Sequence, residues 1–420
     1  MKRRLFVLFL LGFSSGLPLC LVSSTLQAWF SVDSMSILAV SMLGLLGQPY
    51  MFKFLWSPWM DRFTIGNTER RRGWIFLLQI CLIVLLLCLS FLTPQQHPLW
   101  MTSIALLIAF SSASQDTVID AYRTEMLPTK ERGLGTAFAV AGYRIAILLS
   151  GGLALIIAQY WGWRITYQCM AMLMFIGILG NYFAPRLPSE NEKNVQEKHC
   201  NLYVALRELL QNKTSWLFIL FIFLYKLGDA FTSTSSSLSI PFFIQGLHFD
   251  LATIGVVNKM GGIISAIAGS IIAGIILLRV SLFRALLLFG IGQAFSVLIF
   301  LSLSLVGKNL PLLITAVVLD NLIAGMLTTA LLSLMMGLCD RRFTATHFAF
   351  LSAVSAFPRV IAGPLGGLLQ NFIGWKGLYL LVFFATWPSL ILLCYLFSES
   401  RSKHCAFSCS EMKNKISSQT

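Results

Sequence analysis

Charged residues are scarce in this 420-residue chain. Asp, Glu, Lys and Arg make up only 11% of it, whereas 57% of the residues are hydrophobic. A soluble domain of this length would need far more charge on its surface. The apolar residues instead form repeated runs of about 20 residues, long enough to cross a hydrocarbon core of roughly 30 Å. Because lipid offers an exposed backbone no hydrogen bonds, such runs must be helices, and the sequence predicts an all-α membrane protein.

The motifs of ATP-driven pumps, disulfide frameworks and metal sites are also missing. No Gly-x4-Gly-Lys-Ser/Thr loop occurs, and no polar stretch is large enough for a nucleotide-binding domain. The nine cysteines fall within apolar runs or on segments expected inside the cell, so no disulfides are indicated. His404, Cys405 and Cys409 are too sparse for a metal site. We expect neither a metal nor a cofactor.

About twelve apolar spans are visible, six on either side of one long polar stretch. Their approximate limits are 5–30, 36–58, 73–93, 99–121, 134–158, 163–183, 215–240, 251–277, 282–306, 311–337, 345–370 and 376–397. With the N-terminus placed inside, only Arg164, Lys308 and Lys376 fall in outer loops, so the positive-inside rule puts both termini in the cytoplasm. The expected division is an N-terminal half (1–184), a cytoplasmic linker (185–214), a C-terminal half (215–398) and a cytoplasmic tail (399–420).

The net charge of +14 needs no nucleic-acid partner, because the basic residues are spread over inner loops beside anionic lipid.

The two halves share a weak internal repeat. In "AGYRIAILLSGG" Arg144 stands seven residues before Gly151, and in "AFPRVIAGPLGG" Arg359 stands seven before Gly366. A Gly-Trp-basic turn follows each, at 162–164 and 374–376. Two similar six-helix halves are typical of the major facilitator fold.

Nine ionisable residues lie within or at the ends of the spans. A charge facing lipid at mid-depth costs at least roughly 2.5 kcal/mol, so these groups must face one another or a hydrated cavity. They are Lys53, Asp116, Asp120, Arg144, Lys226, Asp229, Lys259, Asp320 and Arg359.

Four of these residues, Lys53, Asp120, Lys226 and Asp229, can also be explained by a structural role without a part in a transport site. Lys53 is close to the inner end of its span, which favours snorkelling to the interface. Asp120 with Arg123 forms either an interfacial ion pair or part of a site. Lys226 and Asp229, three residues apart, either neutralise each other or belong to the site.

The buried carboxylates are candidates for proton coupling, since a carboxylate in a poorly hydrated cavity can take a proton from one side and release it on the other. Asp116 is the first candidate, followed by Asp229 and Asp320, with Asp120 beside them.

Mid-span cations outnumber the deeper carboxylates, which favours an anionic substrate bound by Arg forks. The candidate substrate-binding residues combine these cations with polar and aromatic neighbours: Arg123, Arg144, Lys226, Lys259, Arg359, Gln27, Asn258, Asn321, Tyr122 and Tyr225, with Tyr143 as a further stacking aromatic.

Two Asp-Arg loops are candidates for a cytoplasmic gate. Asp61 and Arg62 follow the second span, and Asp340, Arg341 and Arg342 follow the tenth. Pairs of this kind can latch one conformation of an alternating-access cycle. The alternative is charge that only sets the membrane topology.

Several stretches in both halves resemble the AmpG-type muropeptide permeases of the major facilitator superfamily. They are "GFSSGLPLCLVSSTLQAWF", "KFLWSPWMDRF", "SASQDTVIDAYRTEMLP", "RFTATHFAFLSA" and "GWKG". The resemblance implies proton-linked import of anhydro-muropeptides, a disaccharide with a carboxylate-rich peptide, across the bacterial inner membrane. It also places the family's acidic pair of the fourth span at Asp116 and Asp120. Some members carry additional C-terminal spans, and related proteins include acetyl-CoA carriers.

Secondary transport by a monomer, with a small anionic substrate and protons, is therefore the predicted function. Transport of another anionic metabolite, such as acetyl-CoA, is the alternative. An intramembrane enzyme is a distant third, because Lys226-Leu227-Gly228-Asp229 lacks the first glycine of the Gly-x-Gly-Asp motif of membrane aspartyl proteases.

Overall fold

The computed structural model describes residues 2–33, 43–65, 69–186, 202–211, 213–232, 239, 242–249, 251–254, 257 and 261–417. Within these ranges all regular structure is helical. The candidates Asn258 and Lys259 lie outside the described residues, as does the side chain of Arg341.

The helices before the linker pack with one another, and we call them the N half. In chain order they are α1 (Lys2–Val22), α2 (Ser24–Val32), η1 (Leu43–Gly47), α4 (Gln48–Phe52), η2 (Lys53–Leu55), α5 (Ser57–Arg62), α6 (Arg70–Ser90), α7 (Pro98–Met126), η3 (Thr129–Glu131), α8 (Arg132–Leu148), η4 (Leu149–Leu153), α9 (Ala154–Leu173) and α10 (Phe175–Tyr182). Helix α1 packs mainly on α8, and α6 packs on α7 and α9.

The helices after the linker form the C half. They are α13 (Lys213–Thr232), η5 (Phe242–Gly246), α15 (Leu251–Ile254), α16 (Gly262–Arg279), α17 (Leu282–Val306), α18 (Leu310–Leu338), η7 (Arg341–Phe343) and α19 (Thr344–Ser417). Helix α19 packs on α13 and α17, and α16 packs on α18. A short helix, α12 (Leu202–Leu210), lies in the linker and contacts both α13 and α19.

Ten helical segments among the described residues are long and apolar enough to span a membrane. One of them, Thr129–Tyr182, is 54 residues long and contains two spans, because Gly162 (φ 79°) breaks it. Gly374 (φ 67°) breaks α19 in the same way. Only glycine adopts such a backbone at little cost, so the two Gly-Trp-basic turns predicted from the repeat are confirmed as turns between successive spans.

Small residues let the principal helix pairs approach closely in both halves. A side chain at Gly12 would collide with the backbone carbonyl of Ala139, across the α1–α8 contact. One at Gly269 would collide with the carbonyl of Leu322, across the α16–α18 contact. Close backbone packing of this kind drives helix association where no hydrophobic effect operates.

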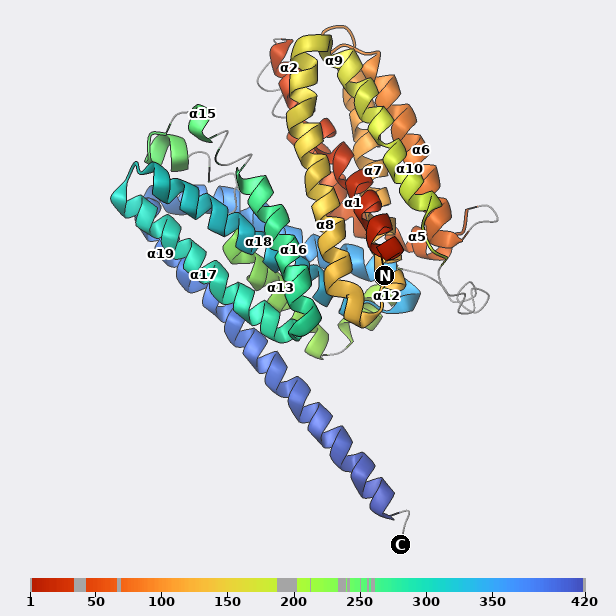
Figure 1. Ribbon diagram of the computed structural model, residues 1–420, viewed down its shortest axis with the longest axis vertical. Coiled ribbons are helices and arrows are strands. Elements are labelled where there is room, and N and C mark those ends of the chain that lie inside the picture. Colours follow the sequence, from red (N-terminus) through yellow and green to blue (C-terminus); the bar gives the residue numbers. More distant parts are fainter. Residues whose placement is uncertain are drawn as a thin grey trace.

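The halves meet at one end of the molecule and diverge at the other (Figure 1). We call the first the basic end: α1 begins there, and α5 and α12 lie there. Toward this end α8 packs against α16, and α19 packs against α5 and α7. At the opposite, far end, α2 and α9 stand well apart from α15 (Figure 1).

Candidate functional site

Four charged side chains form a buried group in the N half, which we call the N-half cluster. Lys53 Nζ lies 2.5 Å from Asp116 Oδ2 and 3.8 Å from Asp120 Oδ2. Arg123 Nη2 lies 2.7 Å from Asp120 Oδ1. Ser15 donates a further hydrogen bond of 2.6 Å to Asp116. Two cations balance two carboxylates, so the cluster is neutral when all four are ionised.

The snorkelling interpretation of Lys53 was wrong. Its residue is only 2% exposed, and its ammonium group points into the protein toward Asp116 rather than out to the interface. The reason is the shape of the second span, which passes through the short segments η1, α4, η2 and α5 rather than one regular helix. A regular helix was the basis for placing Lys53 relative to the membrane surface.

A second charged group lies between the halves, and we call it the central cluster: Arg144, Lys226, Asp229 and Arg359. Lys226 Nζ lies 2.7 Å from Asp229 Oδ2 and donates to Thr328 Oγ1 at 3.3 Å. Arg144, from the N half, and Arg359 both interact electrostatically with Asp229 and with each other. Three cations face one carboxylate, which leaves this cluster with a formal charge of +2.

One cation of the central cluster is not buried. Arg359 is exposed although it lies within an apolar span, and its electrostatic neighbours include Lys226 and Arg144. A guanidinium group with those neighbours faces the space between the halves, not the lipid. The neutral phenol of Tyr143 lies near both Asp116 and Arg359.

Asp320 differs from the other carboxylates within the spans. It is fully buried in the C half, where Ser296 Oγ donates to it at 2.6 Å and Gln293 Nε2 at 3.3 Å. Among the described residues no lysine or arginine pairs with it, and its Oδ2 has no hydrogen-bond partner. An unpaired ionised carboxylate in this position would be costly, so the surroundings suit a neutral carboxylic acid.

At the basic end Asp61 joins the two halves. Its buried carboxylate accepts hydrogen bonds from the backbone N–H of Ala345 (3.1 Å) and from the N–H and hydroxyl of Thr346 (2.9 and 2.6 Å), at the start of α19. Arg71 Nη2 lies 2.7 Å from the same carboxylate and 2.6 Å from Glu125. An acidic group at a helix N-terminus satisfies free N–H groups and suits the helix dipole. We call Asp61, Arg71 and Thr346 the latch.

Among the gate candidates whose side chains are described, Asp340, Arg342 and Arg62 form no ion pair with a described residue of the opposite half. Asp340 pairs with Arg342 at 2.9 Å, and Arg342 pairs with Glu208 of α12 at 2.9 Å. The hydrogen bond from Arg342 holds the pKa of the Asp340 carboxyl below its usual value, so the pair stays ionised at neutral pH. Arg62 is exposed and lies over the ring of Phe63.

With this geometry established, residues 4–357 match the sequence model of the Major Facilitator Superfamily. The chain belongs to this superfamily. It is 45% identical over 388 residues to the anhydromuropeptide permease of Escherichia coli K12, covering 92% of this chain and 78% of that protein. It is 29% identical to the putative transporter AmpG 1 of Rickettsia bellii, covering 94% of this chain and 98% of that one.

The superfamily fold is also found by structural comparison. The superfamily transporter FucP, solved in its outward conformation, superimposes with a TM-score of 0.70 at 14% identity, over 94% of this chain and 97% of FucP. Likeness at this identity concerns the fold alone. The chain is thus a multi-pass secondary transporter and not an enzyme, as predicted from its sequence.

Some predicted substrate-binding residues make their hydrogen bonds outside the N-half cluster and the central cluster. Tyr122 is fully buried and donates to the carbonyl of Pro185, and Tyr225 is buried and donates to the carbonyl of Leu286. Asn321 donates to Val317 on its own helix, beside Gly262 of α16. Gln27 is half-buried in α2, toward the far end. The hydroxyls of the two tyrosines thus bond neighbouring segments, and the predicted roles of the tyrosines and Asn321 in substrate binding stay predictions.

The structure adds residues that sequence reasoning missed or treated as loop charge. Arg71 is only 1% exposed and holds both Asp61 and Glu125. In the sequence it is one of three consecutive arginines, and the positive-inside rule accounts for such a run without a specific contact. A partner such as Lys53 could have been expected from the fourth span. Its two carboxylates, Asp116 and Asp120, have only one cation near them in the sequence, Arg123, so a second cation must come from elsewhere in the chain.

Proposed function

We propose that this chain imports anhydro-muropeptides, or cargo of the same anionic amino-sugar class, across the bacterial inner membrane in symport with protons. The similarity to the E. coli anhydromuropeptide permease extends over nearly the whole chain and supports the cargo. The observation that carries the proposal is the central cluster, where three cations from both halves face one carboxylate. Such a site favours a substrate with several carboxylates, since Arg forks bind carboxylate in two parallel hydrogen bonds.

The orientation follows from charge. The basic end faces the cytoplasm, because inner loops carry the excess of Lys and Arg. In Figure 1 the two halves then lie together toward the cytoplasm and apart toward the outer side. Alternating access requires the halves, 1–184 and 215–398, to rock about the central cluster, with linker 185–214 joining them. The latch closes the inner end, and its release opens the inward path. A single chain holds both clusters and the latch, and we propose a monomer.

Asp116 is the proposed proton carrier. Its side chain is 23% exposed, so it is accessible to water, and the neutral phenol of Tyr143 lies near both Asp116 and Arg359 of the central cluster. Protonation neutralises the Asp116 carboxylate, and Lys53 can then pair with another anion. Proton binding and cargo binding are thereby linked, because protonation of Asp116 changes the charge of the N-half cluster from zero to +1. Asp320, fully buried, is proposed as a neutral acid that does not cycle. Asp120 and Asp229 stay paired with their cations.

The test is uptake of labelled anhydro-muropeptide into proteoliposomes of the purified chain, with an imposed gradient that is acid outside. Wild type should accumulate the label, and a protonophore should abolish the accumulation. Asp116→Asn should lose gradient-driven accumulation but keep exchange of internal for external cargo, which needs no net proton movement. Asp320→Asn, a matched change that mimics a neutral acid, should retain both.

Three results would contradict the proposal. Accumulation by Asp116→Asn would exclude this residue as the carrier. Loss of accumulation in Asp320→Asn alone would move the carrier to the C half. Uptake of labelled acetyl-CoA without uptake of labelled anhydro-muropeptide would replace the proposed cargo by acetyl-CoA.

A further inference from the structure

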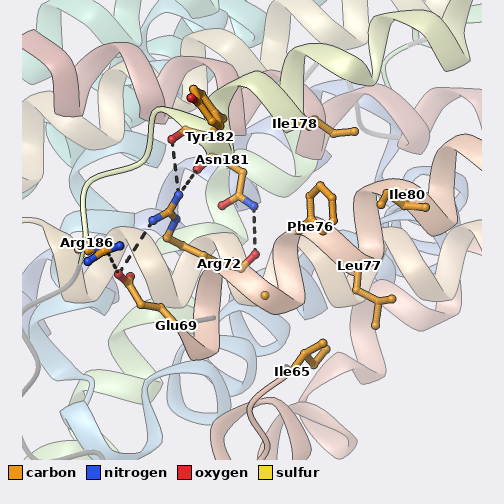
Figure 2. Close-up of a pocket in the computed structure, with 11 residues that line it drawn as sticks. Ile65, Glu69, Arg72, Phe76, Leu77, Ile80, Ile178, Asn181, Tyr182 and Arg186 are labelled. Carbon is orange, nitrogen blue, oxygen red and sulfur yellow. Dashed lines mark hydrogen bonds and ion pairs between the residues drawn. The ribbon is translucent and has the colours of Figure 1, made fainter. Parts of the chain in front are cut away.

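A pocket of about 730 Å³ lies on the surface of the N half, between α6 and α10 (Figure 2). Its walls come from Ile65 and from residues 69–80 and 178–186, and none of the described residues that line it belongs to the C half. The central cluster, in contrast, involves charges from both halves. This pocket therefore lies outside the transport path.

The pocket has a charged end and an apolar end. Arg72, Arg186 and Glu69 lie at the charged end, and Phe76, Leu77 and Ile80 continue along α6 (Figure 2). Ile80 lies eight residues after Arg72, which is about 12 Å along a helix. Phe76 and Leu77 are 47% and 46% exposed, on the surface of a spanning helix that meets hydrocarbon. The pocket thus passes from charged to apolar in the direction from basic end toward mid-membrane.

The charge of the polar end favours an anion. Glu69 lies 4.0 Å from an Arg72 nitrogen and 3.7 Å from Arg186 Nε, so one carboxylate faces two guanidinium groups at the long limit of ion pairing. The side chain of Arg186 remains 88% exposed. An incoming phosphodiester can bind both arginines, because guanidinium groups bind phosphate oxygens through parallel N–H bonds.

The wall between α6 and α10 is fixed by hydrogen bonds. Arg72 Nη2 donates to the carbonyl of Asn181 at 3.2 Å, and Asn181 Nδ2 donates to the carbonyl of Arg72 at 3.0 Å (Figure 2). The two helices are therefore held at a set spacing around the pocket. A ligand entering it meets a formed surface and does not have to order the walls.

We propose that this pocket binds an anionic phospholipid of the cytoplasmic leaflet, with its phosphodiester at Arg72 and Arg186 and an acyl chain along Phe76 and Ile80. The polar linker after Arg186, which reads "LPSENEKNVQEKHCN", has too few apolar residues to fill the apolar end. A free phosphate would occupy only the charged end. A lipid matches both ends, and the cytoplasmic leaflet supplies anionic lipid beside basic segments.

The experiment is native mass spectrometry of the full-length chain in detergent, with phosphatidylglycerol or phosphatidylcholine of the same acyl chains. Wild type should retain one phosphatidylglycerol in preference to phosphatidylcholine. Arg186→Gln should weaken its retention about fivefold, the usual effect of one basic residue near a lipid headgroup. Arg284→Gln removes the same charge at the start of α17, outside the pocket, and should retain the lipid as wild type does.

The remaining arms separate the other occupants. Millimolar inorganic phosphate should not displace the bound phosphatidylglycerol, and displacement would overturn the lipid assignment. Equal retention of the two lipids by wild type, or equal loss from the two variants, would also overturn it and assign the pocket to the neighbouring linker. Leu77→Trp narrows the apolar end without changing charge and should reduce retention in the same way as Arg186→Gln.

Discussion

Replacement of Asp61 by Asn should open the basic end of the molecule. The Asp61 carboxylate is buried, belongs to the N half, and accepts three hydrogen bonds from Ala345 and Thr346 of the C half. These contacts require the halves to touch at the basic end. Any loss of their energy therefore acts on the equilibrium between the two transport states, and not only on folding.

The magnitude follows from burial and charge. A hydrogen bond to a charged group contributes about 1.5–3 kcal/mol, and three such bonds cross from the C half to Asp61. Asn keeps one acceptor oxygen but presents an N–H group in place of the other, so part of this energy is lost, whereas the pair of Arg71 with Asp61 lies within the N half and does not bear on the two states. A loss of about 3 kcal/mol corresponds to a change of roughly 150-fold in the ratio of the two states. A protein that rests almost wholly closed at this end would then populate the open state measurably.

The change can be measured as a distance between spin labels on the two halves, at exposed Lys130 and Arg284, in a background with the nine native cysteines replaced. Wild type should give one short distance, and Asp61→Asn a second, longer population. Glu208→Gln is the matched control, since it removes the same charge at this end from a pair with Arg342, whose other ion-pair partner, Asp340, also belongs to the C half. Identical distance distributions for Asp61→Asn and wild type would refute the latch.

Three further changes have defined outcomes. Arg359→Gln should raise the KM for cargo about 10- to 100-fold in an uptake assay, the value of one hydrogen bond to a charged group, and Arg359→Lys should recover only part of it; an unchanged KM would remove Arg359 from the site. Lys53→Met should lower the thermal stability of the purified protein by leaving Asp116 unpaired, and the double variant with Asp116→Asn should regain most of it; additive losses would refute the pairing. Gly374→Ala should destabilise by about 1–2 kcal/mol because of its positive φ, whereas Gly367→Ala, which meets nothing within 4 Å, should be close to neutral in the same melting experiment; equal effects would contradict the turn.

The architecture was predictable from sequence because its causes are local. Apolar runs determine spanning helices, the distribution of Lys and Arg indicates which ends lie together, and the repeat around Arg144 and Arg359 predicts two related halves. The turns at Gly162 and Gly374 were found for the same reason, since a break in a helix depends on a few adjacent residues. The pair Lys226–Asp229 could be proposed from spacing, because side chains three apart share a helix face.

The partners of most charged residues were not predictable, because they come from distant parts of the chain. Lys53 meets Asp116 only because the second span is irregular, and no spacing rule describes that path. Arg71 could not be separated from Arg70 and Arg72 without the packing that buries it. Tyr122 and Tyr225 were candidates for substrate binding. In the structure each hydroxyl donates a hydrogen bond to a carbonyl of a neighbouring segment. An aromatic residue near a charged motif carries no sequence signal that distinguishes packing from binding.

The comparison of the two halves suggests how binding and coupling are divided. Arg144 and Arg359 occupy equivalent places in the repeat and interact with the same carboxylate, so each half supplies one arginine to the proposed anion site. The carboxylates are not symmetric: the N half pairs Asp116 with Lys53, whereas the C half buries Asp320 among hydroxyl and amide groups. A site that must bind cargo equally from either side benefits from symmetry. Proton coupling needs a difference between the halves, because a proton must be bound in one state and released in the other. The asymmetry of the carboxylates, placed beside symmetric arginines, is what this requirement predicts.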